Sequence, residues 1–224
     1  EFSEIENFTV LITKDNLLKR IKDYSENIES IKSGDKDLKA FINISSNQKL
    51  LLFLSSGKVL TLDPNLLPSG KSSPKSYIEL IDVGIDERLI GIFNASTQNR
   101  LLLISKFGKG FISNTEKMIT NQKKGKNIFN FKNKDHLINV HFLNDDHLAL
   151  VSNNEKLLIF DTKSLPTLNK GAGVQLIKLK EKNYITDSVL LNLNKGLTWN
   201  KSNKLKNIND IKMWIGKRAQ VGKK

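Results

Sequence analysis

Short apolar runs, each followed by a small polar turn, recur along the chain. Five such runs cover residues 8–13, 49–54, 100–105, 147–152 and 189–194. Their starts at residues 8, 49, 100, 147 and 189 give a mean period of about 45 residues, which is typical of propeller-like blades. An apolar run of about five residues bounded by turn residues predicts a buried β-strand. The pattern therefore predicts a repeated array of strands.

A second strand is expected after each run, because the intervening turns carry residues that tolerate positive φ, such as Asn16, Gly57 and Gly108. These second strands are expected at residues 17–21, 58–63, 109–113, 156–161 and 204–209. Further strands are expected at residues 40–44, 77–81, 89–93, 127–131, 137–143 and 174–179, and helical turns only at residues 65–67 and 114–120. The sequence thus predicts an all-β fold, a five-bladed β-propeller in which residues 1–224 form one domain.

One loop in each unit is rich in glycine and lysine. These loops cover residues 32–36, 69–72, 122–126, 169–173 and 216–224. Equivalent positions in a radial array lie on the same rim, so the loops would align their charges in one curved stripe. The residues expected on this stripe are Lys32, Lys36, Lys71, Lys75, Lys123, Lys124, Lys126, Lys170, Lys217, Arg218, Lys223 and Lys224.

The charge of the chain supports a phosphate-binding interpretation of this stripe. The chain has 36 Lys and Arg against 23 Asp and Glu, a formal net charge of +13. Such a stripe suits the backbone of double-stranded DNA, whereas the scarcity of arginine argues against bidentate reading of guanine. The alternative is that the lysines only keep the protein soluble, but their recurrence in register favours nucleic acid.

Other chemistries find little support in the sequence. The chain has no cysteine, which excludes disulfides, thiolate nucleophiles and cysteine-bound metals. No apolar stretch approaches the roughly 18 residues of a membrane span. His136, His141 and His147 lack a helical metal-ligand spacing, and we expect them to be structural or surface residues. No catalytic, metal or cofactor site is predicted.

Two segments carry a family resemblance. Residues 56–64 followed by Leu67-Pro68-Ser69, and residues 165–173 followed by a strand at 175–177, resemble blades of the C-terminal domain of ParC, the A-type subunit of bacterial DNA topoisomerase IV. Residues 31–35 and 216–218 also fall in the order expected of this family, so the resemblance covers essentially the whole chain.

The resemblance implies a pinwheel-shaped β-propeller that binds and bends duplex DNA on its basic rim. It further implies attachment to the catalytic core of ParC, which is absent from this chain, and a heterotetramer with ParE, the ATPase subunit. That parent enzyme, a type II topoisomerase, would use Mg²⁺ and ATP through its other domains or subunits. The expected setting is the bacterial cytoplasm, in association with the nucleoid. The expected role is to bias which supercoils and catenanes are acted on during chromosome segregation.

Two alternatives stay open. The gyrase A C-terminal domain is the nearest relative of this family, but its Q-R-R-G-G-K-G box, needed for wrapping DNA, is absent here. Residues 122–126 form only a partial match without the paired arginines. The second alternative is a protein-interaction propeller whose basic rim meets an acidic partner. None of Tyr24, Tyr77 and Tyr184 has the context of an active-site tyrosine, so the fragment itself is expected not to be an enzyme.

Overall fold

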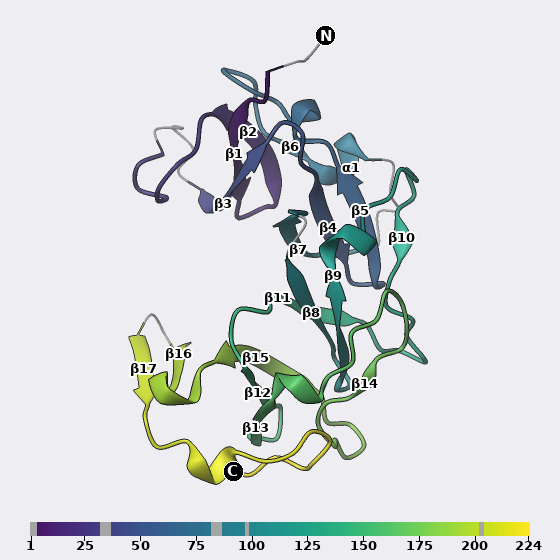
Figure 1. The fold of residues 1–224 in the computed structure, drawn as a ribbon, viewed down its shortest axis with the longest axis vertical. Coiled ribbons are helices and arrows are strands. Elements are labelled where there is room, and N and C mark those ends of the chain that lie inside the picture. Colours follow the sequence, from purple (N-terminus) through teal and green to yellow (C-terminus); the bar gives the residue numbers. More distant parts are fainter. Residues whose placement is uncertain (1–3, 32–36, 82–86, 97–98, 202–203) are drawn as a thin grey trace. The chain divides into compact units, whose positions relative to one another are not determined.

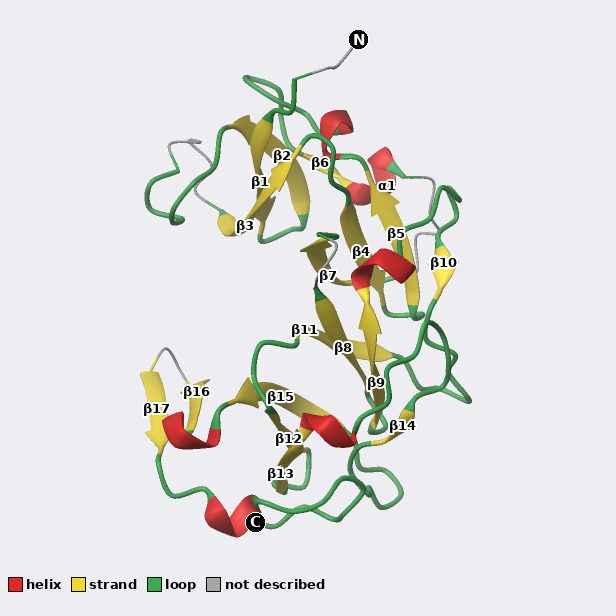
Figure 2. Cartoon of the chain, viewed as in Figure 1, coloured by secondary structure: helices red, strands yellow, loops and turns green. Residues whose placement is uncertain are grey.

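The structure is a computed structural model and describes residues 4–31, 37–81, 87–96, 99–201 and 204–224 (Figure 1). Within these residues short strands joined by turns dominate, and the helical segments are turns of three or four residues (Figure 2). This confirms the all-β prediction. No helix in the described segments combines the length and the apolar character that a membrane span requires.

The chain folds into two compact units. The first comprises Glu1–Gln98 and Thr115–Asn127, and the second comprises Asn99–Asn114 and Ile128–Lys224. We describe each unit by itself. The extent of a single domain over residues 1–224 stays a prediction.

The first unit holds two four-stranded antiparallel sheets. The first sheet has the order β3-β1-β2-β6 and the second the order β10-β5-β4-β7. The strands of the first sheet are β1 (Asn7–Thr13), β2 (Leu17–Lys22), β3 (Leu38–Ser45) and β6 (Lys75–Ser76). The strands of the second sheet are β4 (Leu50–Leu54), β5 (Lys58–Leu62), β7 (Leu89–Asn94) and β10 (Lys126–Asn127).

The second unit holds three antiparallel sheets within the described residues, with the orders β11-β8-β9-β14, β13-β12-β15 and β16-β17. The third sheet consists of β8 (Arg100–Ser105), β9 (Lys109–Asn114), β11 (Leu137–Phe142) and β14 (Val174–Gln175). The fourth consists of β12 (His147–Ser152), β13 (Leu157–Asp161) and β15 (Ile185–Leu191). The fifth consists of β16 (Leu197–Lys201) and β17 (Lys204–Ile208).

Apolar side chains on both faces of the central strands explain why those strands appear as continuous apolar runs. Every residue of β4 is buried. In the first unit, Val10 of the first sheet and Leu52 of the second belong to one buried cluster. In the second unit, Leu102 of the third sheet and Leu148 of the fourth share another. Sheets packed face to face bury both sides of an inner strand, so the simple alternation of a half-exposed strand is lost.

In each of the first three sheets, the edge strand that pairs with the second strand of the hairpin comes from a later part of the chain. We call this edge strand the outer strand. β6 follows the β4–β5 hairpin in sequence but pairs with β2 of the first sheet. In the same way β10 follows the β8–β9 hairpin and pairs with β5, and β14 follows the β12–β13 hairpin and pairs with β9. The C-terminal segment repeats the pattern on the fourth sheet, where the amides and carbonyls of Leu157 and Lys223 form two hydrogen bonds of 2.8 and 2.9 Å. Consecutive sheets are therefore interleaved.

One predicted hairpin strand was wrongly assigned. Residues 189–194 are predicted to open the fifth unit, but the first three of them belong to β15, which pairs with β12 through Val189 and Ala149. The fifth hairpin instead joins β16 to β17. An apolar run marks a buried strand, but it does not show which neighbour that strand pairs with.

Two predicted strands are much shorter than expected, and a third predicted strand forms a short helix instead. Residues 77–81 form α1 (Tyr77–Leu80) because Ser76 and Glu79 make a reciprocal capping box. Of residues 127–131 and 174–179, only the first one or two pair at a sheet edge, in β10 and β14. The helical turns expected at residues 65–67 and 114–120 overlap η1 (Pro64–Leu66) and η2 (Thr115–Lys117), and further turns are η3 (Thr162–Ser164), η4 (Leu193–Lys195) and η5 (Lys212–Trp214).

Candidate nucleic-acid interface

The glycine- and lysine-rich loops lead into the outer strands of the sheets. Lys75 lies in β6 opposite Leu18, and Lys126 lies in β10 opposite Val59. The loop that contains Lys170 leads into β14, and the last loop brings Lys223 opposite Leu157. Four basic loops therefore lead to equivalent edge positions, each in its own sheet.

The glycines of these loops have a packing role. Gly125 has φ +76°, and a Cβ atom there would lie 2.6 Å from Leu60 Cδ2 and 2.7 Å from Val59 O. Gly173 has φ +68°, and its Cβ would lie 2.8 Å from Gly110 O. The structure shows that they allow close approach to the neighbouring strand of their own sheet.

Most of the predicted contact residues hold their side chains in solvent. The exposed members are Lys71, Lys75, Lys123, Lys124, Lys170, Lys217, Lys223 and Lys224. Within the described ranges, the ion pairs between side chains involve other residues, so these eight lysines keep their charge available for a ligand. Lys32 and Lys36 lie outside the described residues.

Two predicted contact residues also have internal roles. Lys126 is partly buried, and its Nζ donates a hydrogen bond of 2.7 Å to the carbonyl of Lys117. Arg218 is partly buried as well, and its Nη1 donates to the carbonyl of Gln175 at 2.7 Å. Arg218 thereby ties the C-terminal segment to β14. These two side chains stabilise the loops that carry the exposed lysines.

Several acidic side chains of the first unit are engaged by lysines outside the predicted stripe. Lys49 Nζ lies 2.6 Å from Asp63 Oδ2, and Lys58 Nζ lies 2.8 Å from Glu87 Oε1. Partial burial opposes the ionisation of Asp63, but hydrogen bonds from Lys49 and from Asn65 outweigh it and lower the pKa of the carboxyl. Burial likewise opposes the ionisation of Glu87, and its bonds to Lys58 and Ser56 lower its pKa. Both carboxylates are therefore satisfied locally.

The three histidines lie in separate environments. His147 Nδ1 pairs with Asp146 at 2.8 Å, and His136 Nδ1 lies 3.4 Å from the carbonyl of Lys134. His141 Nε2 shares a hydrogen bond of 2.7 Å with Ser188 Oγ. Among the described residues no three His, Asp or Glu side chains come together as a metal site.

The tyrosines take part in packing and hydrogen bonding. Tyr77 is buried and donates from its hydroxyl to the carbonyl of Glu87 at 2.7 Å. Burial and the charge of Glu87 raise the pKa of this hydroxyl. Tyr24 shares a hydrogen bond with Ser45, and the ring of Tyr184 lies under Lys106 Nζ. Trp214 packs on the apolar cluster between the fourth and fifth sheets, as expected of a packing residue.

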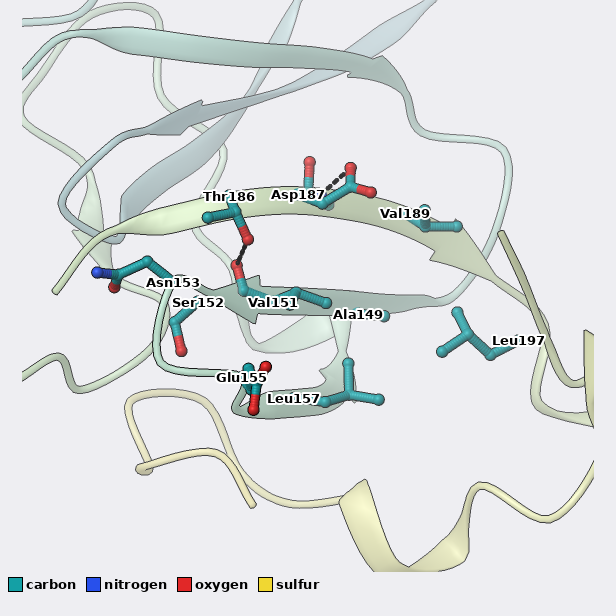
Figure 3. A pocket seen from close by; sticks show the side chains of 11 residues that line it. Ala149, Val151, Ser152, Asn153, Glu155, Leu157, Thr186, Asp187, Val189 and Leu197 are labelled. Atoms are coloured by element: carbon teal, nitrogen blue, oxygen red, sulfur yellow. Dashed lines mark hydrogen bonds between the residues drawn. The ribbon is translucent and has the colours of Figure 1, made fainter. Parts of the chain in front are cut away.

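A hollow of about 570 Å³ lies on one face of the fourth sheet (Figure 3). Its apolar part includes Val151 and Val189, while Glu155 and Asp187 add carboxylates. Figure 3 shows Thr186 bonded across to the carbonyl of Val151, at 3.2 Å, which joins β15 to β12 along this hollow. Because the titratable groups that line it are acidic, this hollow does not suit a phosphate.

The sequence interpretation missed a second group of exposed lysines. Lys178, Lys180 and Lys182 follow β14 and lie around the turn that contains Phe107. Their regular spacing of two residues could have identified them. They follow the glycine-rich loop, however, and the predicted contact residues lie in or next to such loops. The structure brings them beside the β8–β9 hairpin of the third sheet.

The sequence is similar to known proteins over nearly its whole length. A family model described as the DNA gyrase C-terminal domain, a β-propeller, matches residues 99–144 and 146–192. The A-type subunit of DNA topoisomerase 4 from Rickettsia bellii is 31% identical over 97% of this chain and 30% of its own length. The corresponding protein of Caulobacter vibrioides is 30% identical over 86% of this chain and 25% of its own length. The chain therefore spans less than a third of these relatives.

Solved structures share the fold. The Escherichia coli ParC C-terminal domain superposes with a TM-score of 0.83 at 20% identity, covering 97% of this chain and 93% of that one. The DNA gyrase A C-terminal domain superposes with a TM-score of 0.64 at 21% identity, covering 97% and 76%. Together with the family model, these likenesses show a fold of the β-propeller class.

Proposed function

We propose that this chain, which belongs to the family of C-terminal β-propeller domains of topoisomerase IV ParC and DNA gyrase A, binds and bends duplex DNA with the loops that lead into its outer strands. The observation that carries this proposal is the set of eight exposed lysines without acidic partners in loops that are equivalent from sheet to sheet. Each of these loops presents exposed cations at the edge of its own sheet, which suits contact with a phosphate backbone.

The parent protein would be a type II topoisomerase. In that setting the domain would hold a DNA segment for the catalytic core of the same polypeptide, and would bias which supercoils or catenanes are processed during chromosome segregation. ParE, the ATPase subunit, would act together with Mg²⁺ and ATP in other parts of that assembly, in the bacterial cytoplasm at the nucleoid. We propose no cofactor and no catalytic residue for the domain itself.

The first test is the salt dependence of binding to a duplex of mixed sequence. If about 5–8 phosphates are neutralised, log K should fall against log salt with a slope of roughly −4.5 to −7. Fluorescence anisotropy on several unrelated sequences measures both the slope and the expected lack of sequence preference. Affinity that is unchanged between low and moderate salt would contradict the proposal.

A pair of charge-matched variants then localises the contact. Lys123 and Lys124 are exposed beside β10, so K123A/K124A should weaken binding to all sequences alike and make the slope shallower by about 1.8. Lys126 is left in place because of its bond to Lys117. The control K14A/K39A removes two lysines near β3, at the opposite edge of the first sheet from β6. Equal losses in both variants would argue against an outer-edge track.

A further inference from the structure

The β8–β9 turn of the third sheet presents an aromatic ring to solvent. Phe107 is 40% exposed although most large apolar side chains of the neighbouring strands are buried. The turn closes with a hydrogen bond of 3.2 Å from the amide of Gly108 to the carbonyl of Ser105. Single exposed apolar side chains are common on protein surfaces, so the surroundings of this ring, more than its exposure, bear on its role.

Side chains from two other segments hold this turn rigidly. The carboxylate of Asp135 accepts from the amide of Phe107 at 3.0 Å and from Ser105 Oγ at 2.7 Å. On the other side, the Gln175 amide group donates to the carbonyls of Gly108 and Ile177 at 3.1 and 2.6 Å. These hydrogen bonds thus hold the backbone of the turn at Phe107 in place.

Lysines line the two hollows that Phe107 borders. One hollow, of about 510 Å³, is lined by Lys109, Lys132 and Lys134. The other hollow, of about 430 Å³, is lined by Lys178, Lys180 and Lys182. The acidic members of these linings are Asp135, whose carboxylate already accepts hydrogen bonds from the turn, and Glu181.

The equivalent turn of the second sheet shows that the backbone does not require an aromatic residue here. Gly57 and Gly108 share the same φ of +83°, and the position before the glycine is Ser56 in one turn and Phe107 in the other. Ser56 Oγ donates to Glu87 Oε2 at 2.7 Å, and Lys58 also binds that carboxylate. The second-sheet turn is therefore small and locally neutral, whereas the third-sheet turn is apolar and flanked by free cations.

We propose that Phe107 is a wedge that enters the minor groove of duplex DNA and opens a base step, while the lysines of the two hollows bind phosphates on either side. Apolar side chains inserted between base steps kink DNA, and flanking cations bind the phosphates of the duplex on either side of the kink. This inference rests on the proposed function and deepens it, because it assigns the deformation of DNA to one side chain.

The experiment uses two end-labelled duplexes, one fully paired and one with a central mismatch that makes the step easier to open. The intact chain should bind the mismatched duplex about 10-fold more tightly, because opening a weak step costs less. It should also raise the energy transfer between the two end labels, because a bend brings the ends of the duplex closer together. Phe107→Ser, the residue of the equivalent turn, should lose this preference and the energy-transfer change while keeping the salt slope. Phe107→Leu, which keeps an apolar wedge, should retain most of both.

Matched variants separate the wedge from its surroundings. Leu66→Ser removes another exposed apolar side chain, 66% exposed, and should leave the mismatch preference unchanged. K178Q/K180Q/K182Q should make the salt slope shallower by about 2.7 while the preference for the mismatch persists. A thermal midpoint of Phe107→Ser within about 2 °C of the intact chain would show that the turn still folds.

The outcomes are distinguishable. If the intact chain binds neither duplex at low salt, both the wedge and the proposed function fail. If the intact chain binds DNA and Phe107→Ser keeps its mismatch preference and bend, the wedge fails and the proposed function stands. If K178Q/K180Q/K182Q keeps the salt slope of the intact chain on DNA but loses binding to polyglutamate, used as an acidic polypeptide probe, the proposed phosphate contacts of these lysines are overturned in favour of an acidic protein.

Discussion

Single glycines decide whether the outer strands can reach their sheets. Gly125 combines positive φ with a site in which a Cβ would meet Leu60 and the carbonyl of Val59, whereas Gly70 has φ +60° and open space around it. Only the first position therefore joins backbone strain to a steric clash. This difference makes the pair a direct test of the packing role.

We predict that Gly125→Ala lowers the free energy of unfolding by about 2–3 kcal/mol, from strain and overpacking together. Gly70→Ala should cost about 1 kcal/mol, because it carries the strain of positive φ alone. Urea denaturation followed by circular dichroism measures both. Equal costs would show that the close approach at β10 contributes nothing to stability.

The third and fourth sheets meet at a partly buried histidine. His141 on β11 and Asn139 beside it both bond to Ser188 Oγ on β15, at 2.7 and 2.6 Å. Burial lowers the pKa of His141 below its ordinary value of 6.5, and the nearby charge of Asp187 only partly opposes this. The unfolded chain therefore binds the proton more readily than the folded chain.

It follows that the free energy of unfolding should fall as pH is lowered below about 6.5, until the folded-state pKa is reached. His141→Gln should flatten this part of the pH profile of thermal stability. His136→Gln, at a ring that bonds the Lys134 carbonyl, is the control and should keep the slope. A profile of His141→Gln that parallels the intact chain would contradict the prediction.

Hairpins could be predicted from sequence, but the pairing of the edge strands could not. A hairpin is encoded locally by two apolar runs and a turn such as that at Gly57 or Gly108, so β4–β5 and β8–β9 lie close to where they were expected. β6 pairs with β2, which is more than fifty residues away in sequence. No local pattern in its two residues identifies that partner.

The same limit applied to the candidate interface. The recurrence of lysine and glycine identified loops that lead into edge strands, but it did not show that Lys126 and Arg218 are bonded internally. It also missed Lys178 and its neighbours, because their relation to Phe107 exists only after β14 pairs with β9. Tertiary pairing creates that part of the surface.

At the scale of elements, the C-terminal segment should act as the outer strand of the fourth sheet. Ending the chain at residue 215 removes the partners of Leu157 and of Lys178, whose amides donate to Lys223 and Gln220. Hydrogen exchange should therefore speed up in β13 and at Lys178, while the β1–β2 hairpin keeps its protection.

A second variant separates this structural role from charge. K223A/K224A keeps the backbone bonds of the segment, so β13 should remain protected while DNA affinity falls. Undiminished protection of β13 in the truncated chain would show that the Leu157 to Lys223 pairing contributes little to the sheet.

For the whole molecule, the net charge of +13 includes exposed lysines that have no ion pair among the described residues, whereas acids such as Asp63 and Glu87 are bonded to other lysines. Under the proposed function, many weak phosphate contacts would hold DNA without fixing one path for it. Residues 122–126 also lack the paired arginines of the gyrase box. From these two features we propose bending rather than strong wrapping.

We therefore predict little or modest change in linking number when nicked circles are religated with saturating amounts of this domain. Two-dimensional agarose gels of the religated circles measure the change. A strong positive writhe per bound domain would assign the chain to the wrapping activity expected of the gyrase relative.

The returning outer strands also bear on how the protein is made. A ribosome releases the first sheet before its last strand, which arrives only with Ser76, and the next two sheets wait for Asn127 and Gln175. During synthesis the newest sheet always exposes an unpaired edge that only the following repeat can close, and such edges invite pairing with other nascent chains. Gain or loss of a blade in evolution would therefore have to include a hairpin together with the edge strand of its predecessor.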